Sequence, residues 1–545
     1  MTAAATTIDA PAPAAPVPVD KWLVTASIGF GSLMASIDSS IVNVALPQIR
    51  GSVGATIEEI TWVTTSYVVA TVLVMPLTGF LGSLLGQKRV YLASLVLFVL
   101  GSALCGMAHS LPTLVLFRTI QGFGAGALQP TQQAILRQTF PAKEQGMAMA
   151  MFAMVIMVGP AVGPTLGGYI VDNYSWQWIF YINVPIGFVG TFMTWRNVVE
   201  PQDVLLANRA RAAAQRKNLD IAGIVLMCVG VSLLQYVLEE GPRDDWFDSP
   251  LITALSALAA VSLVAFVIRE LTAVAPVVDL RLFRDRTFAS ATAIGGVMFA
   301  MLMGSLFLLP VFMQELLGFD AMHSGITLMP RTLAMILVMP LIGRLYNHVP
   351  PAATVALGVL CFAFGSYQLS HITLASSSTD IVIPLIVTGL GFACLFIPLT
   401  TAALTFIPRE KLADAAGLNS FVRQIGGSLG LTMFATMLTR YGKRATASVS
   451  WNVTGLRPDV SARLDAVAAG LRAHGMSALD AKQTALRALA GAVAKQGIVL
   501  AFEKTFLLQG VVFLAVLPLL FFLRVRRGPS TEQAGPSEPP ELTME

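Results

Sequence analysis

The sequence predicts an all-α membrane protein with fourteen transmembrane helices. Of its 545 residues, 55% are hydrophobic and 12% are charged, whereas soluble globular proteins carry about 25% charged residues. The apolar residues gather in fourteen continuous runs, most of them close to the ~20 residues that a helix needs to cross a bilayer. Continuous runs also argue against a membrane β-barrel, because barrel strands alternate apolar and polar residues.

The fourteen runs follow one another along the chain. They cover residues 22–46, 58–80, 89–108, 112–134, 147–171, 178–196, 221–238, 251–268, 288–312, 323–346, 352–371, 381–406, 415–438 and 505–523. The seventh and eighth runs are set off from the others by charged connections on both sides. An even number of spans places both termini on the same side of the membrane.

Basic residues predict which side that is. If the termini are inside, the inner connections hold twenty Lys and Arg residues, and the short outer loops hold only Arg50 and Arg243. Cytoplasmic loops of membrane proteins carry such an excess of basic residues. We therefore expect cytoplasmic termini in a multi-pass protein of the inner membrane.

The two ends of the chain and one long connection differ from the spans. Residues 1–20, rich in Ala and Pro, and the polar residues 525–545 are predicted to be disordered tails. The connection 440–504 is predicted to lie outside although it carries ten Lys and Arg residues, because long translocated segments escape the charge rule. Apolar residues at helical spacing in 464–471 and 479–493 predict two amphipathic helices in it.

A face without side chains marks the fifth span. The members of this face recur at four-residue spacing, with one further glycine at the end: Gly159, Pro160, Gly163, Pro164, Gly167 and Gly168. Residues four apart share one face of a helix, and small faces let membrane helices approach closely. Packing of this kind is common in membranes, so the glycines alone have a structural as well as a functional interpretation. The repeated Gly-Pro pairs need an explanation beyond packing.

Two charged residues inside the spans are candidates for proton coupling. Asp38 lies in the first span and Arg118 about six residues into the fourth. Charges in a bilayer are costly and commonly functional. A carboxylate in an apolar cavity could load and release protons, with Arg118 tuning it; the alternatives are a structural ion pair, a position near the headgroups, or an arginine that snorkels.

Further residues are candidates for a substrate cavity or for gating. They are polar or charged groups, helix-breaking prolines and flexible methionines inside the spans: Asn43, Gln121, Gln129, Pro130, Met154, Gln314, Arg331 and Arg423. Cysteine and histidine residues have no metal-ligand spacing, so no metal site or cofactor is predicted. The sequence holds no phosphate-binding loop or nucleophile motif, which argues against ATP-driven transport and against an enzyme.

These motifs resemble the major facilitator superfamily, and within it the fourteen-span drug/proton antiporter branch of EmrB/QacA type. The first-span stretch 38–47, the fourth-span stretch 114–126, the fifth-span stretch 159–168 and the stretch 173–185 are each similar to motifs of that branch. The resemblance continues to Arg423–Gly427 and spans about residues 22–524.

The resemblance implies a fold and a mechanism. Two six-helix bundles, residues 21–196 and 288–524, would rock about a central cavity, with two inserted spans and their charged linkers in 197–287. Protonation of Asp38 from outside would be coupled to the export of apolar or cationic compounds. The small face of the fifth span would let the bundles slide. Members of EmrB type work with a periplasmic membrane-fusion adaptor and an outer-membrane channel, which are therefore candidate partners that could dock on residues 440–504. Similar transporters without adaptors also carry such loops, so this point stays open. No nucleic-acid partner is expected.

Four positions depart from the superfamily pattern, and one of them is Gln177, which stands where an Arg is frequent. Ser83 stands where an Asp is usual, Gln87 where a basic residue is usual, and Asn347 where the second half often has Asp. A charge latch at the inner end of the bundles is therefore expected to be weakened.

Other functions remain open from the sequence. The nearest is proton-coupled import or export of one specific metabolite. The Gly-Pro face of the fifth span favours antiport over import by symport. A non-transporting sensor or scaffold in the membrane is an alternative of another class. It would act through residues 440–504 or the tails.

Overall fold

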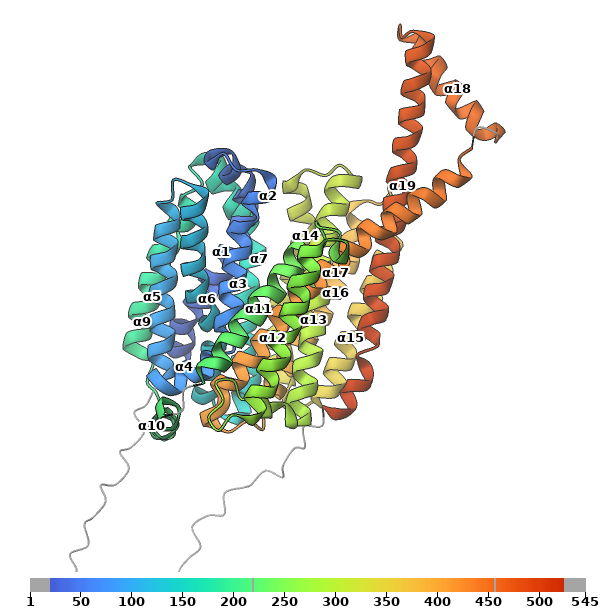
Figure 1. Ribbon diagram of the computed structural model, residues 1–545. Coiled ribbons are helices and arrows are strands. Elements are labelled where there is room, and N and C mark those ends of the chain that lie inside the picture. Colours follow the sequence, from blue (N-terminus) through green and yellow to red (C-terminus); the bar gives the residue numbers. More distant parts are fainter. Residues whose placement is uncertain (1–19, 218–219, 455–456, 524–545) are drawn as a thin grey trace, which may run out of the picture.

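A computed structural model describes residues 20–217, 220–454 and 457–523, and every regular element in these ranges is helical. The helices form two side-by-side groups, with two further helices packed against them (Figure 1). The predicted tails 1–20 and 525–545 lie outside the described residues, apart from Asp20, which caps the first helix.

The first group holds the first six predicted spans. Its helices are α1 (Lys21–Val53), α2 (Ile57–Ile60), α3 (Trp62–Val74), α4 (Thr78–Leu85), α5 (Gln87–Gly106), α6 (Leu111–Thr139), α7 (Gln145–Asn173), α8 (Trp178–Tyr181) and α9 (Asn183–Asn197). The second predicted span is broken: α3 and α4 meet at 58°. The break surrounds Pro76, because proline has no backbone donor and cannot continue the helix without strain.

The connection to the second group contains three helices. They are α10 (Gln202–Lys217), α11 (Ile221–Glu240) and α12 (Pro250–Thr272). The pair α11 and α12 corresponds to the two inserted spans. Helix α10 was expected only as a charged linker, because its sequence is rich in Ala and Arg.

The second group holds the remaining spans. Its helices are α13 (Arg286–Val311), α14 (Ala321–Leu345), α15 (Pro351–Leu369), α16 (Ser378–Ala403), α17 (Leu412–Asn452), α18 (Pro458–Ala473) and α19 (Ala478–Leu514). Short helical turns complete the described chain at Ala142–Glu144, Trp246–Asp248, Leu280–Arg284, Phe312–Leu316, Arg409–Lys411 and Leu517–Phe522.

Residues 440–504 form a helical hairpin that projects from one end of the molecule (Figure 1). The two amphipathic segments predicted here are α18 and the first part of α19. The connection is not a separate unit, however, since α17 and α19 run without a break from the body into the hairpin. We call this end the hairpin side, and the opposite end, where Lys21 and Leu523 lie, the terminal side.

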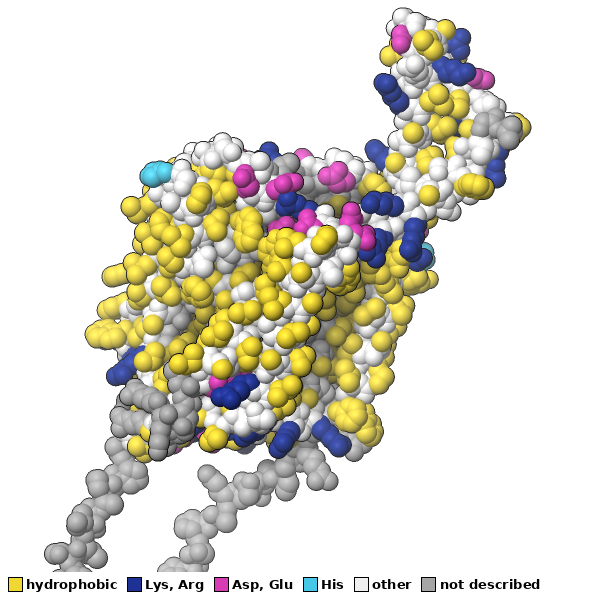
Figure 2. Space-filling model, in the orientation of Figure 1, with side chains coloured by type: hydrophobic (Ala, Val, Ile, Leu, Met, Phe, Trp, Pro, Cys, Tyr) yellow, Lys and Arg dark blue, Asp and Glu magenta, His cyan; other side chains and the backbone are white. Residues whose placement is uncertain are grey.

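On the face shown in Figure 2, apolar side chains form a broad belt across both groups. Eleven described helices are long and apolar enough to cross a membrane, or twelve if the bent pair α3–α4 is one span. The other two predicted spans are α6 and α17, which are long helices but do not pass the same test of length and composition. The fourteen-span count therefore stays a prediction.

Candidate functional site

Asp38 of α1 and Arg118 of α6 form an ion pair buried inside the first group. A guanidinium nitrogen of Arg118 lies 2.7 Å from Oδ2 of Asp38, and the side chains are 1% and 0% exposed. The sequence placed these two charges in separate spans, and the fold brings them into contact. Of the interpretations that the sequence left open, neither snorkelling nor a headgroup position fits this burial.

The Asp38 carboxylate is also held by two amides. Nε2 of Gln121 and Nδ2 of Asn183 donate to its Oδ1 at 2.8 and 2.9 Å. The expected apolar cavity around the carboxylate is therefore wrong, because a cation and two amide donors surround it. Asn183 also donates to Oγ of Ser102 at 3.1 Å, so α1, α5, α6 and α9 meet in one polar cluster.

Arg118 keeps three other partners besides the carboxylate. It donates to Oε1 of Gln121 at 2.7 Å and to the carbonyl oxygen of Val63 at 3.2 Å. Its guanidinium carbon lies 4.1 Å from the ring centre of Tyr67, a distance at which a cation is attracted to the aromatic face. The charge of Arg118 is therefore stabilised from α3 as well as from α1.

Close packing of α6 fixes the position of this cluster. A Cβ on Gly122 would lie 2.5 Å from the carbonyl oxygen of Tyr67, and a Cβ on Gly101 would lie 2.7 Å from the backbone of Gln121. Glycine at both places lets α3 and α5 touch the α6 backbone. The amide of Gln121 and the ring of Tyr67 thus reach the ion pair.

The small face of α7 packs against α1 at the level of Asp38. A Cβ on Gly159 would lie 2.4 Å from the carbonyl carbon of Ser36, and one on Gly163 would lie 2.4 Å from Cβ of Ser40. The expectation that this face lies between the two bundles is therefore wrong: its partner is a helix of the same group. The predicted close approach itself is present.

One of the motif prolines has a defined structural role. Pro160 lacks the N–H that would bond to the carbonyl oxygen of Ile156 four residues earlier. The hydroxyl of Ser36 donates to that carbonyl oxygen from α1. Helix α7 thus remains continuous from Gln145 to Asn173 through both prolines.

The second group contains two buried arginines. Arg331 is 2% exposed and donates to Oγ of Ser305 at 3.0 Å. Arg423 is 5% exposed, donates to Oγ1 of Thr400 at 3.1 Å, and reaches Oε1 of Gln133 in the first group at 3.4 Å. Neither arginine has a carboxylate within 4 Å among the residues that the structure describes.

The remaining predicted site residues are not brought together with Asp38 and Arg118 by any contact. Six of these residues are buried or half-buried: Gln129, Pro130, Met154, Pro160, Gly167 and Gly168. Three are exposed: Asn43, Pro164 and Gln314. Gln121 is the one cavity candidate that joins the ion pair.

On the terminal side the two groups touch. Gly146 of α7 and Gly343 of α14 approach so closely that a Cβ on Gly146 would lie 2.5 Å from the carbonyl oxygen of Gly343. Asn347 donates to the carbonyl oxygen of Lys143 at 2.5 Å. Gln138 of α6 donates to the carbonyl oxygen of Arg409 at 3.3 Å.

Helix α10 bridges the groups where the charge latch was expected to be weak. Oγ of Ser83 donates to Gln215 of α10 at 2.5 Å. Four residues earlier on the same helix, Arg211 lies 2.9 Å from Oδ2 of Asp414 in the second group. Gln87 is buried, and no described residue bonds its Oε1. Ser83, where the resemblance led us to expect an acid, thus bonds to the connecting helix.

Three side chains of the polar cluster around Asp38 were not among the predicted site residues. Asn183, Ser102 and Tyr67 each contact the ion pair or its partners. Asn183 lies in the quoted stretch 173–185, so its polar side chain at the start of an apolar run was an available signal. Ser102 and Tyr67 carry no signal, because single hydroxyl groups are common in membrane spans.

The family comparison agrees with this architecture. Residues 28–431 match the model of the Major Facilitator Superfamily. The chain is 34% identical over 507 residues to the multidrug export protein EmrB of Haemophilus influenzae, covering 92% of this chain and 95% of that protein. It is 34% identical over 504 residues to the fatty acid resistance protein FarB of Neisseria gonorrhoeae, covering 92% and 96%. It is 32% identical over 507 residues to EmrB of Escherichia coli K12, covering 92% and 95%.

Two solved structures share the fold. The human organic anion transporter MFSD10 (TETRAN) superimposes with a TM-score of 0.62 and 12% identity, covering 93% of this chain and all of that chain. The proton:xylose symporter XylE gives a TM-score of 0.57 and 12% identity, covering 91% and 95%. With its many apolar helices, the chain is a multi-pass transporter of the inner membrane rather than an enzyme, and it belongs to the Major Facilitator Superfamily, in its EmrB type.

Proposed function

We propose that the protein exports small apolar or cationic compounds in exchange for protons. The observation that carries this proposal is the fully buried Asp38–Arg118 pair, in a chain whose relatives include multidrug export proteins. A charge enclosed in a membrane helix bundle is costly. Reversible protonation of the Asp38 carboxylate would explain why a charge is placed inside the helix bundle.

The surroundings of the pair support reversible protonation. When Asp38 takes up a proton, its attraction for Arg118 is lost. Arg118 would then retain Gln121, the Val63 carbonyl and the Tyr67 ring. Leaving a buried charge without a partner costs about 3–5 kcal/mol, and these contacts lower that cost. One proton moving down 100 mV supplies about 2.3 kcal/mol.

The coupled movement would pass along α1. Asp38 lies two residues from Ser36, whose hydroxyl donates to the α7 carbonyl left free by Pro160, and α7 meets α14 at the terminal side. In this proposal the contacts of the terminal side are those of a state open toward the hairpin side. Protonation of Asp38 shifts α1 against α7 and favours opening of the terminal side.

Orientation and partners complete the proposal. Fourteen spans with cytoplasmic termini would place the hairpin side outside the cell membrane, in line with the distribution of basic residues. The hairpin of α17, α18 and α19 would then stand in the periplasm. Its exposed apolar residues, including Leu479 at 67% and Leu486 at 47%, provide a surface for a membrane-fusion adaptor that leads to an outer-membrane channel.

The test is transport by the full chain in proteoliposomes with an imposed pH gradient. We expect Asp38→Asn to reduce gradient-driven accumulation of a lipophilic cation to the level of protein-free vesicles, while exchange without a gradient persists. Asp172→Asn is the matched control, because Asp172 is an exposed carboxylate in the same group. Accumulation by Asp38→Asn equal to the parent would overturn the role of Asp38.

A second substrate class has its own support. The buried Arg331 and Arg423 have no acidic partner among the described residues, and one relative is a fatty acid resistance protein. Export of amphiphilic carboxylates would give these cations a partner. The same vesicles decide the matter: accumulation of a long-chain fatty acid but not of the cation would assign the anionic class, and the reverse would exclude it.

A further inference from the structure

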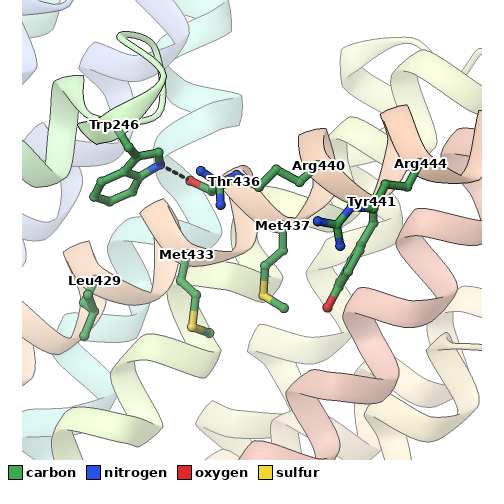
Figure 3. Close-up of a pocket in the computed structure, with 8 residues that line it drawn as sticks. All are labelled: Trp246, Leu429, Met433, Thr436, Met437, Arg440, Tyr441 and Arg444. Carbon is green, nitrogen blue, oxygen red and sulfur yellow. Dashed lines mark hydrogen bonds between the residues drawn. The ribbon is translucent and has the colours of Figure 1, made fainter. Parts of the chain in front are cut away.

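A cavity of about 390 Å³ lies beside α17 at the hairpin side, outside the site described above. Its floor is apolar and includes Leu429, Met433 and Met437, and its rim is basic, with Arg440 and Arg444. Figure 3 shows Met433, Met437 and Tyr441 projecting from the same side of α17. Leu429, Met433, Met437 and Tyr441 follow four-residue spacing on α17, and Thr436, Arg440 and Arg444 form the row beside them.

The loop between the two inserted helices indicates at which level of the membrane this cavity lies. Trp246 lies in that loop, and its indole Nε1 donates to Oγ1 of Thr436 at 2.9 Å (Figure 3). Because α11 and α12 both end or begin at this loop, Thr436 lies near the membrane boundary. Tryptophan is enriched at that level. Arg440, four residues farther along α17, is then ~6 Å beyond it, at the level of the headgroups.

The two arginines of the rim are not satisfied by the protein. Neither Arg440 nor Arg444 has an ion pair or a side-chain hydrogen bond with any residue in 20–217, 220–454 or 457–523. Both are exposed. Of the acidic residues in the nearby loop, Glu240 pairs with Arg243 at 3.1 Å, and no described carboxylate of that loop lies within 4 Å of either arginine. Two adjacent cations thus remain free at the polar end of an apolar cavity.

A second hollow of about 360 Å³ continues the first toward α19. It shares Tyr441 and Arg444 with the first and adds Lys504. The ammonium of Lys504 lies 4.7 Å from the ring centre of Tyr441. Figure 2 shows basic side chains gathered at the base of the hairpin, where the apolar belt ends.

We propose that this groove holds an anionic phospholipid of the leaflet on the hairpin side, with its phosphate at Arg440 and Arg444 and its acyl chain along Met433 and Met437. The apolar floor reaches the lipid-facing surface, because Leu429 is 51% exposed. A free phosphate would use the rim alone, and a lipid uses both parts. Basic residues near an anionic headgroup each contribute to its retention. The bound lipid would join α17 to the inserted pair through Trp246.

The experiment measures lipid retained by the full-length protein, purified in detergent, by native mass spectrometry. The probes are phosphatidylglycerol and phosphatidylcholine of equal chain length. We expect preferential retention of phosphatidylglycerol, and a fall of about 30-fold in its affinity for Arg440→Gln/Arg444→Gln, equivalent to about 1 kcal/mol for each guanidinium. Arg463→Gln/Arg472→Gln removes the same charge from exposed positions of α18 and is expected to bind as the parent does.

Two further arms separate the lipid from other occupants. Met433→Gln/Met437→Gln keeps the basic rim and is expected to weaken phosphatidylglycerol retention, whereas a site for phosphate alone would be unaffected. Glycerol 3-phosphate is expected not to compete. Equal retention by the arginine variant and the parent, or displacement by glycerol 3-phosphate, would overturn the proposal. Displacement by a transported cation at equal concentration would also overturn it, because the groove would then be a substrate site.

Discussion

At the residue scale, the ion pair and the small face of α7 meet on a short stretch of α1. Ser36, Asp38 and Ser40 lie within two turns of α1. Asp38 pairs with Arg118, and the two serines on either side of it contact α7. The Asp38–Arg118 pair and the seam between α1 and α7 are thus not independent. A change in either one is transmitted through the same few residues of α1.

The seam gives a prediction with a control on the same helix. Gly159→Ala would place a Cβ 2.4 Å from the Ser36 carbonyl carbon, whereas Gly168→Ala meets nothing within 4 Å. Overpacking costs about 1–3 kcal/mol, and alanine in an open helical position gains up to ~1 kcal/mol over glycine. We expect Gly159→Ala to lower the melting temperature of the detergent-solubilised protein and to impair export. Gly168→Ala should leave both unchanged or raise the melting temperature.

Equal melting temperatures and equal export for the two variants would mean that the α1–α7 contact is loose. The direction of transport would then have no support from this helix. The Asp38 experiment would remain unaffected by that result.

The polar cluster shows the limit of sequence reasoning at this scale. Asp38 and Arg118 were found because a charge inside an apolar run is conspicuous. Their pairing could not be derived, since it depends on how α1 and α6 pack. Asn183 is a neutral residue near a span end, and only the fold shows that its amide reaches Asp38.

At the scale of elements, α10 connects the groups without crossing the membrane belt. The stretch 202–217 was expected only as a charged linker, so neither its helix nor its contacts were predicted. Its polar contacts are specific: Gln215 accepts from Ser83 in the first group, and Arg211 donates to Asp414 in the second. Asp414 is 4% exposed, and Arg211 is its ion-pair partner in the described chain.

Removing one member of that pair tests whether α10 stabilises the observed state. Arg211→Gln leaves the Asp414 carboxylate buried without a cation. We expect a loss of about 1–3 kcal/mol, between the values for exposed and for buried pairs, because Arg211 is 26% exposed. Thermal unfolding in detergent measures it. Arg211→Gln/Asp414→Asn is expected to recover most of the loss, and a single variant as stable as the parent would show that the pair contributes nothing.

The predicted elements otherwise match the helices closely, with two informative differences. The second span is broken at Pro76, where the sequence showed a proline but not the 58° angle. Residues 440–504 were expected as a separate outer segment, and they are extensions of two spans. Periodicity identifies a helix, but it does not show whether the helix continues from its neighbour.

At the scale of the whole molecule, the two groups are in contact at the terminal side through the backbones of α7 and α14. A Cβ on Gly343 would lie 2.9 Å from both Cβ of Ala150 and the carbonyl oxygen of Gly146. We expect Gly343→Ala to disfavour this closed arrangement by about 1–3 kcal/mol, a 5- to 150-fold shift in population. Gly325→Ala on the same helix meets nothing within 4 Å and is the control.

Distances between spin labels on the terminal side measure this shift. Lys143 and His348 are exposed residues of the two groups, and labels there should report longer distances in Gly343→Ala than in the parent or in Gly325→Ala. Identical distance distributions in all three proteins would show that the glycine contact does not set the conformational equilibrium. The two-group architecture was predictable from the resemblance, but the state of closure was not.

The continuity of α17 has a mechanical consequence. Its 41 residues run from Leu412, beside the α10 contact, to Asn452 in the hairpin. A helix of this length is ~60 Å long, so a tilt of about 10° at its lower end would sweep the far end through about 10 Å. Movement that separates the two groups would thus be amplified at the hairpin tip. In such a movement the hairpin would act as a lever arm, and a protein resting on its tip would be displaced with it.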